Sequence, residues 1–295
     1  MDHREEVRDF LASRRARLTP ADVGLPATMG RRRVPGLRRD EVAVLAGVSS
    51  EYYARLERGN LAGASDAVLD ALAAALRLDE AEQLHLRNLA HAANQPARKR
   101  CTPTRAASVP PSLQRVLDSM TTAPAYLHDT RLDIVAANDL ARELHAPVYD
   151  FARATGAPPN TARFAFLDPA GRSFYADWEQ VSRDCVAALH SAAGRNPFDK
   201  PLSDLVGELS TRSDHFRALW ATHDVRLHRT GVKRLRHPDV GVLALDYDVM
   251  QVVQEPGLML VAYSAAPGSA EADGLALLAS LAATRRDAAT TAPGA

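Results

Sequence analysis

Between residues 37 and 59, apolar residues recur at helical spacing among polar ones, and this pattern predicts two short helices joined by a tight turn. The apolar positions at helical spacing are Val42, Leu45, Ala46, Tyr53 and Leu56. Gly47 stands where a helix stops in a left-handed conformation, and Ser49 is a preferred residue for starting the next helix. Ala43 has a small side chain at the expected crossing, where it lets the two backbones approach closely. We therefore predict a helix-turn-helix over residues 37–59.

The polar positions on the outer face of the second helix have the chemistry of a DNA-reading surface. They are Ser50, Glu51, Tyr52, Arg55 and Arg58, and the capping residue Ser49 is assigned to the same DNA-binding surface. Arg55 can donate two hydrogen bonds to guanine, and Ser50 and Glu51 can contact base edges in the major groove. Arg38 and Arg39 open the preceding helix and are expected to neutralise phosphates.

The distribution of charge supports DNA binding better than the total charge does. The chain has 36 basic and 36 acidic residues and is neutral as a whole. Between residues 11 and 39, however, eight arginines face one acidic residue, Asp22. Three of them, Arg31, Arg32 and Arg33, form a run that we assign to the DNA-binding surface. A solvated loop explains that run equally well, and an ordinary helical hairpin is the alternative for residues 37–59. The glycine turn and the nearby arginines favour DNA binding.

The rest of the amino-terminal region reads as a small helical bundle of five helices. A first helix ends before Pro20, Ser65 is placed to cap a fourth, and Asp79 with Glu82 forms a capping-box pattern for a fifth. The leucines of the fifth helix are Leu84, Leu86 and Leu89. They could form a dimer seam, but core packing is favoured because a small bundle must bury most of its apolar side chains.

A change of composition divides the chain into domains. Residues 94–111 are rich in proline, arginine and small polar residues, show no helical or strand period, and are predicted to be a linker. We predict a DNA-binding domain over residues 1–93, a second domain over residues 112–284, and a disordered tail over residues 285–295.

The second domain mixes the two periods expected of an α+β fold. The strand candidates are residues 125–127, 133–136, 232–236, 242–253 and 258–264. A helix begins near Asp139, and further helical faces are predicted around residues 178–192 and 216–223. Consecutive strands on short turns imply an antiparallel sheet.

Stretches in both halves of the chain resemble the Xre-type helix-turn-helix regulators with a carboxy-terminal PAS-like domain of the MmyB type. The stretches that carry the resemblance are residues 10–17, 36–48, 51–59, 69–76, 162–169, 223–225, 233–238 and 245–247. The resemblance implies a five-helix Cro/C1-type domain followed by a PAS-like antiparallel sheet with flanking helices. It further implies that the second domain binds an apolar small molecule, with a fatty acid or similar amphiphile as the specific expectation.

Aromatic residues of the second domain could line the pocket for such a ligand. They are Phe164, Phe166, Trp178, Phe216, Trp220, Tyr247 and Tyr263. Arg163, His223 and Arg226 are candidate polar anchors for a carboxylate. Plain core packing is the alternative explanation for each aromatic residue.

The sequence lacks the patterns typical of enzymes, and we expect no catalytic activity, no cofactor and no metal. His215, His223 and His228 are not spaced like two zinc ligands on one helix turn. Cys185 falls on an apolar helical face, which indicates a buried thiol rather than a nucleophile.

The absence of an export signal and of long apolar segments leads us to expect a cytoplasmic protein with no membrane association. The expected partners are double-stranded DNA, the fatty-acid-like molecule and a second copy of the chain, since one helix reads few base pairs. The sequence thus indicates a ligand-responsive transcription regulator. A protein-interaction or antitoxin-like module with a secondary helix-turn-helix is the alternative.

Overall fold

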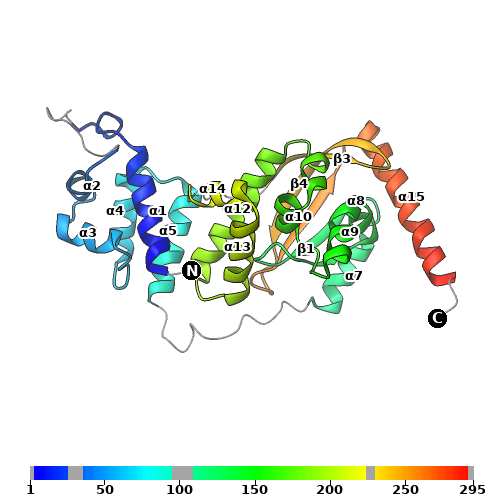
Figure 1. Ribbon diagram of the computed structural model, residues 1–295, viewed down its shortest axis with the longest axis horizontal. Coiled ribbons are helices and arrows are strands. Elements are labelled where there is room, and N and C mark those ends of the chain that lie inside the picture. The colour runs from blue at the N-terminus through cyan, green and yellow to red at the C-terminus, as the bar shows by residue number, and fades with distance from the viewer. Residues whose placement is uncertain (1–2, 26–35, 95–108, 224–229, 292–295) are drawn as a thin grey trace. The chain divides into compact units, whose positions relative to one another are not determined.

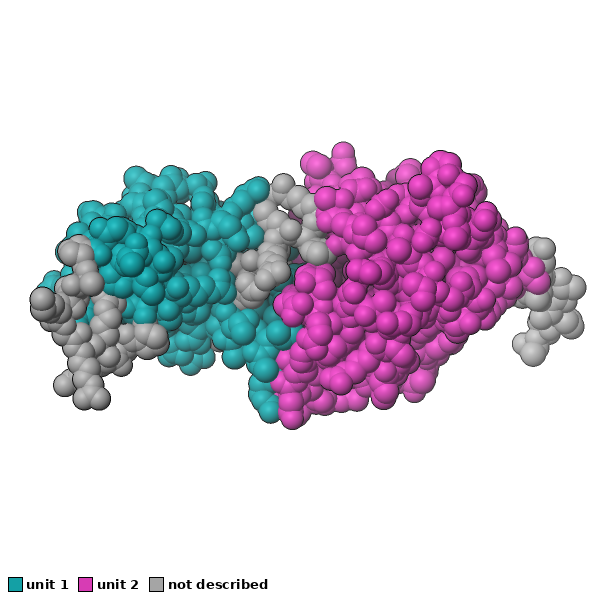
Figure 2. Space-filling model, turned by 90° about the horizontal axis from the view of Figure 1, so that it is seen from above, with its two compact units in different colours: residues 1–104, 186–207, 217–227 teal, residues 105–185, 208–216, 228–295 magenta. Residues whose placement is uncertain are grey.

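The computed structural model describes residues 3–25, 36–94, 109–223 and 230–291, with side chains to residue 286. The chain divides into two compact units, coloured separately in Figure 2. Unit 1 comprises residues 1–104, 186–207 and 217–227. Unit 2 comprises residues 105–185, 208–216 and 228–295. The predicted linker, residues 94–111, lies largely outside the described residues.

Unit 1 contains the five helices predicted for the amino-terminal region (Figure 1). They are α1 (His3–Arg17), α2 (Arg39–Leu45), α3 (Ser50–Glu57), α4 (Asp66–Ala75) and α5 (Glu80–Ala93). A short 3₁₀ helix, η1 (Ala21–Val23), follows α1. The helix starts follow the local sequence, since Ser65 accepts a hydrogen bond from the Val68 N–H and Asp79 forms a complete capping box with Glu82. The five-helix prediction is confirmed.

The core of these helices is built from the apolar stripes that the sequence displays. Its fully buried members include Val7, Phe10, Leu11, Val42, Tyr53, Leu56, Leu72 and Leu89. Core packing is confirmed for Leu86 and Leu89, whereas Leu84 is 43% exposed on the outer side of α5. Helical stripes of this kind stabilise the bundle mainly by removing apolar surface from water.

Two glycines permit the tight geometry around α3. Gly47 has φ +64° between α2 and α3, in the left-handed region that favours glycine. Gly59 has φ +96° just beyond α3, and a Cβ atom there would lie 2.6 Å from the Arg4 carbonyl oxygen. A larger residue at position 59 would therefore separate the end of α3 from α1.

Unit 2 is built on one five-stranded antiparallel sheet (Figure 1). Its strands are β1 (Ala125–His128), β2 (Ile134–Ala137), β3 (Thr230–His237), β4 (Gly241–Gln251) and β5 (Met259–Ser264). Their order across the sheet is β2-β1-β5-β4-β3, and every neighbouring pair is antiparallel. All five predicted strands are present, within two residues of the predicted ends. The predicted fold class is thereby confirmed.

The helices outside the amino-terminal bundle fall into three sets. Those wholly in unit 2 are α7 (Pro111–Ser119), α8 (Asp139–Leu144), α9 (Ala146–Thr155), α10 (Thr161–Leu167), α11 (Pro169–Phe174) and α15 (Ala270–Thr291). Those with residues in both units are α12 (Trp178–Arg195), α13 (Lys200–Arg212) and α14 (Asp214–Trp220). The tail predicted to be disordered begins inside α15, where Arg286 pairs with Asp139 of α8 at 2.8 Å and Arg285 pairs with Glu143.

Asn138 joins β2 to the elements around it through four hydrogen bonds. Its Oδ1 accepts from the N–H groups of Ala125 and Ala141, at 3.1 and 2.8 Å. Its Nδ2 donates to the carbonyls of Met120 and Ala123, both at 2.8 Å. Because the side chain is buried and fully satisfied, it fixes where α8 begins relative to the sheet.

Candidate functional site

Helix α3 has one side held inside unit 1 and one side open to solvent. Ser49 caps the helix, its Oγ accepting a hydrogen bond from the Tyr52 N–H at 3.1 Å. Tyr53 and Leu56 are completely buried, as the apolar spacing predicts. Burial raises the pKa of the Tyr53 hydroxyl well above its usual range, so this side chain stays neutral in the core.

The open side of α3 carries the residues predicted to read DNA. Ser50, Glu51, Arg55 and Arg58 are exposed, and Tyr52 is half-buried. The guanidinium of Arg55 lies over the Tyr52 ring, 5.0 Å from its centroid. Such a contact limits the rotamers of the arginine while leaving its donors free for an acceptor in a groove. Ser49 is also exposed, although its oxygen serves as the helix cap.

Glu57, on the inner side of α3, fixes the helix to the two arginine-bearing segments before it. The side chain is 1% exposed. Its Oε1 lies 2.7 Å from Nη2 of Arg15 in α1, and its Oε2 lies 2.8 Å from Nε of Arg39 in α2. Arg39 thus serves a structural contact, but 55% of its side chain remains exposed. The sequence prediction did not include Glu57. Its place beside Leu56, on the apolar side of α3, could have indicated that it is buried and paired.

The other arginines predicted to contact phosphates divide into two sets. Arg38 is exposed at the start of α2, where its backbone N–H donates to Glu41 at 2.6 Å. Arg31, Arg32 and Arg33 lie outside the described residues.

The interior of unit 2 contains a cluster of aromatic and polar side chains, here called the tyrosine cluster. Its members are Tyr126, His145, Tyr175, Tyr247 and Tyr263, all buried. The ring centroids of Tyr126 and His145 lie 5.1 Å apart, and those of His145 and Tyr263 lie 5.5 Å apart. The Tyr247 and Tyr263 rings follow at 6.1 Å. Tyr126, Tyr247 and Tyr263 come from strands β1, β4 and β5, His145 lies between α8 and α9, and Tyr175 follows α11, so the sheet and its helices assemble the cluster together.

Lys233 of β3 adds a positive charge beside the tyrosine cluster. Its Nζ lies 4.8 Å from the centroid of the Tyr247 ring. Burial lowers the pKa of Lys233, and burial likewise raises the pKa of the Cys185 thiol to about 12. Burial also lowers the pKa of His145 to about 3, so this imidazole is neutral at pH 7. An anion entering this environment would favour the charged form of the lysine.

The sequence contains a signal for Lys233 that residue-by-residue reading overlooks. Side chains two positions apart on a strand point to the same face, which places Lys233 with the buried Leu235 and His237. A lysine on the inner face of a half-buried strand is unusual, because lysine is rarely buried without a partner. Alternation along β3 could therefore have identified it.

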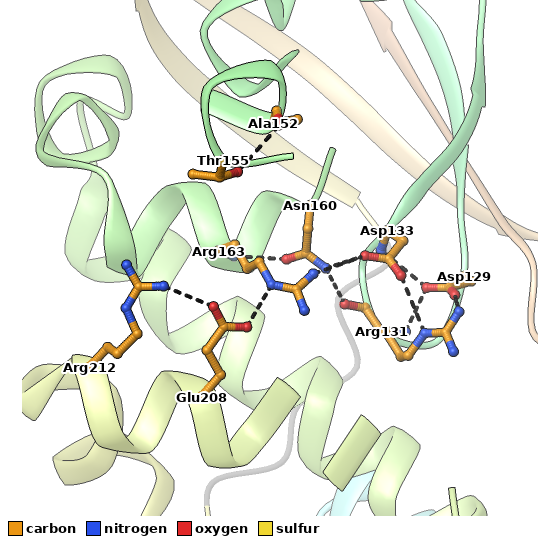
Figure 3. Close-up of polar contacts among 9 residues, drawn as sticks. All are labelled: Asp129, Arg131, Asp133, Ala152, Thr155, Asn160, Arg163, Glu208 and Arg212. Atoms are coloured by element: carbon orange, nitrogen blue, oxygen red, sulfur yellow. Dashed lines mark hydrogen bonds and ion pairs between the residues drawn. The ribbon is translucent and has the colours of Figure 1, made fainter. Parts of the chain in front are cut away.

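Arg163, predicted to anchor a carboxylate ligand, is engaged by carboxylates of the chain itself (Figure 3). Its Nε donates to Glu208 at 2.8 Å, and its Nη1 lies 3.6 Å from Asp133. Asp133 also accepts a hydrogen bond from Asn160 at 2.8 Å and pairs with Arg131 at 3.3 Å. Burial raises the pKa of Asp133, partly opposed by the hydrogen bond from Asn160.

The other residues predicted to line a ligand pocket fall into separate groups. Phe166 packs against both Trp178 and Phe216, with the Phe166 and Phe216 centroids 5.0 Å apart. The indole N–H of Trp178 donates to the Ala165 carbonyl at 2.8 Å. Phe164 is fully buried against Phe174 and Tyr175, and Tyr247 belongs to the tyrosine cluster.

Two of the predicted ligand residues belong to unit 1 and one is not described. Trp220 and His223 lie in the segment 217–227, which clusters with unit 1. Arg226 lies outside the described residues.

Comparison with known families identifies both halves of the molecule. Residues 6–86 match the model of a helix-turn-helix domain. Residues 109–278, more than half of the chain, match the model described as the MmyB-like transcription regulator ligand binding domain. Curated proteins gave no match to the chain.

These matches define a class, a transcription regulator that binds DNA through a helix-turn-helix and carries a ligand-binding domain. The chain belongs to the MmyB-like family of transcription regulators. The predicted family is confirmed in both halves. Among the described residues, no helix combines the length and the apolar character needed to cross a membrane.

Proposed function

We propose that the chain binds operator DNA through α3 and that a fatty-acid-like molecule in unit 2 changes its affinity for DNA. The observation that carries the DNA-reading role is the two-sided α3: its buried side is fixed by Tyr53, Leu56 and Glu57, and its outer side exposes Arg55 and Arg58. A recognition helix needs this combination of rigid seating and exposed donors.

Two features of unit 2 support an acidic amphiphile as the ligand. The tyrosine cluster offers apolar ring surface, and Lys233 lies beside it as a partly desolvated cation. A carboxylate beside Lys233 would compensate the cost of burying that charge. The aromatic residues Phe164, Trp178, Phe216 and Tyr247 are our proposed apolar contacts. Lys233 replaces Arg163 as the anchor we favour, since Arg163 already contacts Glu208 and Asp133.

We further propose that the chain acts as a homodimer on paired half-sites. One recognition helix contacts only a few base pairs, and two copies separated by one turn of DNA, about 34 Å, would read a longer operator. Light scattering on the chain with and without an enriched DNA fragment tests this assembly. A single copy bound to each fragment would contradict it.

Selection of DNA fragments from a random pool by the full-length chain, followed by titration with palmitate, tests the proposed regulation. We expect an enriched sequence and a change of at least about tenfold in its affinity, which needs only about 1.4 kcal/mol of coupling. Hexadecanol, which lacks the carboxylate, should have less effect. Absence of any enriched sequence would instead favour the protein-interaction module.

The variant Lys233→Met separates the response to the ligand from the binding of DNA. It removes the charge while keeping most of the apolar volume, so DNA selection should be unchanged and the palmitate effect should be lost. Lys200→Met is the matched control, since Lys200 is exposed and pairs with Asp204. A palmitate effect that survives Lys233→Met would reject this anchor.

A further inference from the structure

Three potential metal ligands from distant parts of the sequence meet within unit 1. Glu6 lies on α1, His190 on α12, and His223 three residues beyond the end of α14. Glu6 Oε1 lies 3.1 Å from Nδ1 of His190 and 3.6 Å from Nδ1 of His223. One donor atom from each residue lies within 4.8 Å of the other two.

His190 is oriented in the manner of a metal ligand. Its Nε2 lies 2.9 Å from the Trp220 carbonyl oxygen, and its ring stacks on the Trp220 indole with centroids 3.7 Å apart. Because a carbonyl only accepts hydrogen bonds, Nε2 donates to it, while Nδ1 lies within hydrogen-bond distance of Glu6 Oε1, at 3.1 Å. A metal ion bound by Nδ1 and Glu6 would take the place of the proton between these two atoms. Metal-binding histidines typically donate their second ring nitrogen to such a carbonyl.

Nδ1 of His223 is buried and lacks a hydrogen-bond partner among the described residues. The residue is 9% exposed, and the 3.6 Å to Glu6 Oε1 is longer than a hydrogen bond. His223 also has φ +50°, a left-handed conformation that a residue other than glycine rarely adopts. Strain and an unsatisfied donor or acceptor in one residue are features that functional sites retain.

Two of the three residues, Glu6 and His223, border a depression, and His190 lies behind them. Glu6 and His223 line a depression of about 530 Å³, together with Glu5, Asp9, Ser13 and Trp220. Glu6 itself is 4% exposed and His190 is fully buried. An ion could therefore enter from the depression and keep a water molecule on that side, while protein encloses the other side.

We propose that Glu6, His190 and His223 form a binding site for a divalent transition metal, with Zn²⁺ as the ion that suits it best. Two imidazoles and one carboxylate form a borderline donor set that Zn²⁺ accepts with an open fourth position. In tetrahedral coordination, bonds of about 2.0–2.1 Å place neighbouring donor atoms roughly 3.3 Å apart. Glu6 Oε1 lies 3.1 Å from Nδ1 of His190 and 3.6 Å from Nδ1 of His223, and both distances are close to this value. Rotation of the His223 side chain can shorten the longer of the two distances.

His85 is the group that most closely adjoins the site from α5. Its Nε2 lies 3.8 Å from Glu6 Oε1, and its ring packs edge-on against Phe10. Asp9 Oδ2 lies 3.9 Å from Nε2 of His223 and can orient that ring from the opposite side. The site thus has three ligands and nearby groups able to hold them in place.

Calorimetric titration of untagged, chelator-treated full-length chain with Zn²⁺ tests the proposal. We expect one Zn²⁺ bound per chain and a higher melting temperature in its presence. Glu6→Gln and His190→Gln each remove a ligand, and should each weaken Zn²⁺ binding by at least the roughly 10–100-fold that the loss of an outer-shell partner costs. His91→Gln, at an exposed histidine of α5, is the matched control and should bind Zn²⁺ like the unaltered chain.

Because Glu6 and His190 are buried, X-ray absorption on the unaltered chain provides a measurement that needs no variant. A shell of nitrogen and oxygen with the outer scattering of two imidazoles supports the site. No Zn²⁺ bound, binding unchanged in both variants, or sulfur among the ligands would each overturn it. DNA binding enters none of these measurements, so their outcome is independent of the function proposed above.

Discussion

The α3 surface and the polar network of unit 2 use arginine in opposite ways. Arg55 and Arg58 are exposed, and no ion pair among the described residues includes either of them. The Arg163 side chain is 20% exposed and lies against Glu208 and Asp133 (Figure 3). An arginine surrounded by carboxylates holds the fold, whereas one kept apart from them remains able to bind an external anion. Pairing, more than residue type, distinguishes a binding surface from a structural network.

Replacing Glu57 tests whether its ion pairs with Arg15 and Arg39 stabilise the fold, and this replacement has the largest expected effect. Glu57→Gln leaves Arg15 partly buried without its carboxylate, and we expect a loss of about 4 kcal/mol in the free energy of unfolding. Urea denaturation measures it. Asp70→Asn, which breaks the exposed pair with Arg87, should cost less than about 1 kcal/mol. Equal losses in the two variants would mean that the buried ion pair of Glu57 stabilises the fold no more than an exposed ion pair does.

The buried imidazole of His145 makes the stability of unit 2 depend on pH. Burial lowers its pKa from 6.5 to about 3 in the folded chain, so below pH 6.5 the unfolded chain binds a proton that the folded chain does not. Stability contributed by the neutral ring is complete above pH 6.5 and is lost progressively as the pH falls toward 3.

His145→Gln should therefore flatten the dependence of unfolding free energy on pH. In the unaltered chain, His145 should make the free energy of unfolding fall by roughly 2 kcal/mol between pH 7 and pH 5, at about 1.36 kcal/mol for each pH unit below 6.5. The variant should lack this part of the fall. Urea denaturation at several pH values gives the slope. His91→Gln, at an exposed position, should leave the slope as it is, and an unchanged slope in His145→Gln would mean that this ring is already protonated in the fold.

Arg55→Ala tests the outer side of α3. Loss of a two-pronged contact to guanine should weaken binding to the selected sequence by about 1–3 kcal/mol and change binding to random DNA little. Competition binding with the two kinds of DNA measures the difference. An equal loss on both would assign Arg55 to phosphate contact.

Arg38→Ala has the smallest expected effect. In contrast to Arg55→Ala, it should affect binding to all DNA sequences equally. Removal of one phosphate contact should weaken binding to all sequences alike and reduce the slope of log affinity against log salt by about 1. Titration at several salt concentrations gives this slope. A loss confined to the selected sequence would place Arg38 at a base.

The fold could be predicted from the sequence wherever the determinants are local. Ser65 and the pair Asp79 and Glu82 begin their helices as expected, because a cap acts within one helical turn. The strands followed from short runs of β-forming residues between turns. The continuation of α15 was missed because Arg285 and Arg286 pair with residues of α8, and such distant contacts leave no periodic signal.

The candidate sites divide in the same way. The open positions of α3 could be read from helical spacing, since the motif is continuous in the sequence. Glu57, Lys233 and the Glu6, His190 and His223 group depend on partners from other elements. The histidine spacing considered in the sequence, among residues 215, 223 and 228, tests only ligands on one helix. It does not address ligands brought together from three segments.

The two sides of α3 define how the operator preference of this regulator could be redesigned. Ser49, Tyr53 and Glu57 are each committed to a cap, the core or an ion pair. The positions free of such commitments are Ser50, Glu51, Arg55 and Arg58. A combinatorial library confined to these four codons would vary the groups offered to base edges while keeping the scaffold constant. Screening such a library against altered operators could yield regulators that respond to the same ligand at new promoters.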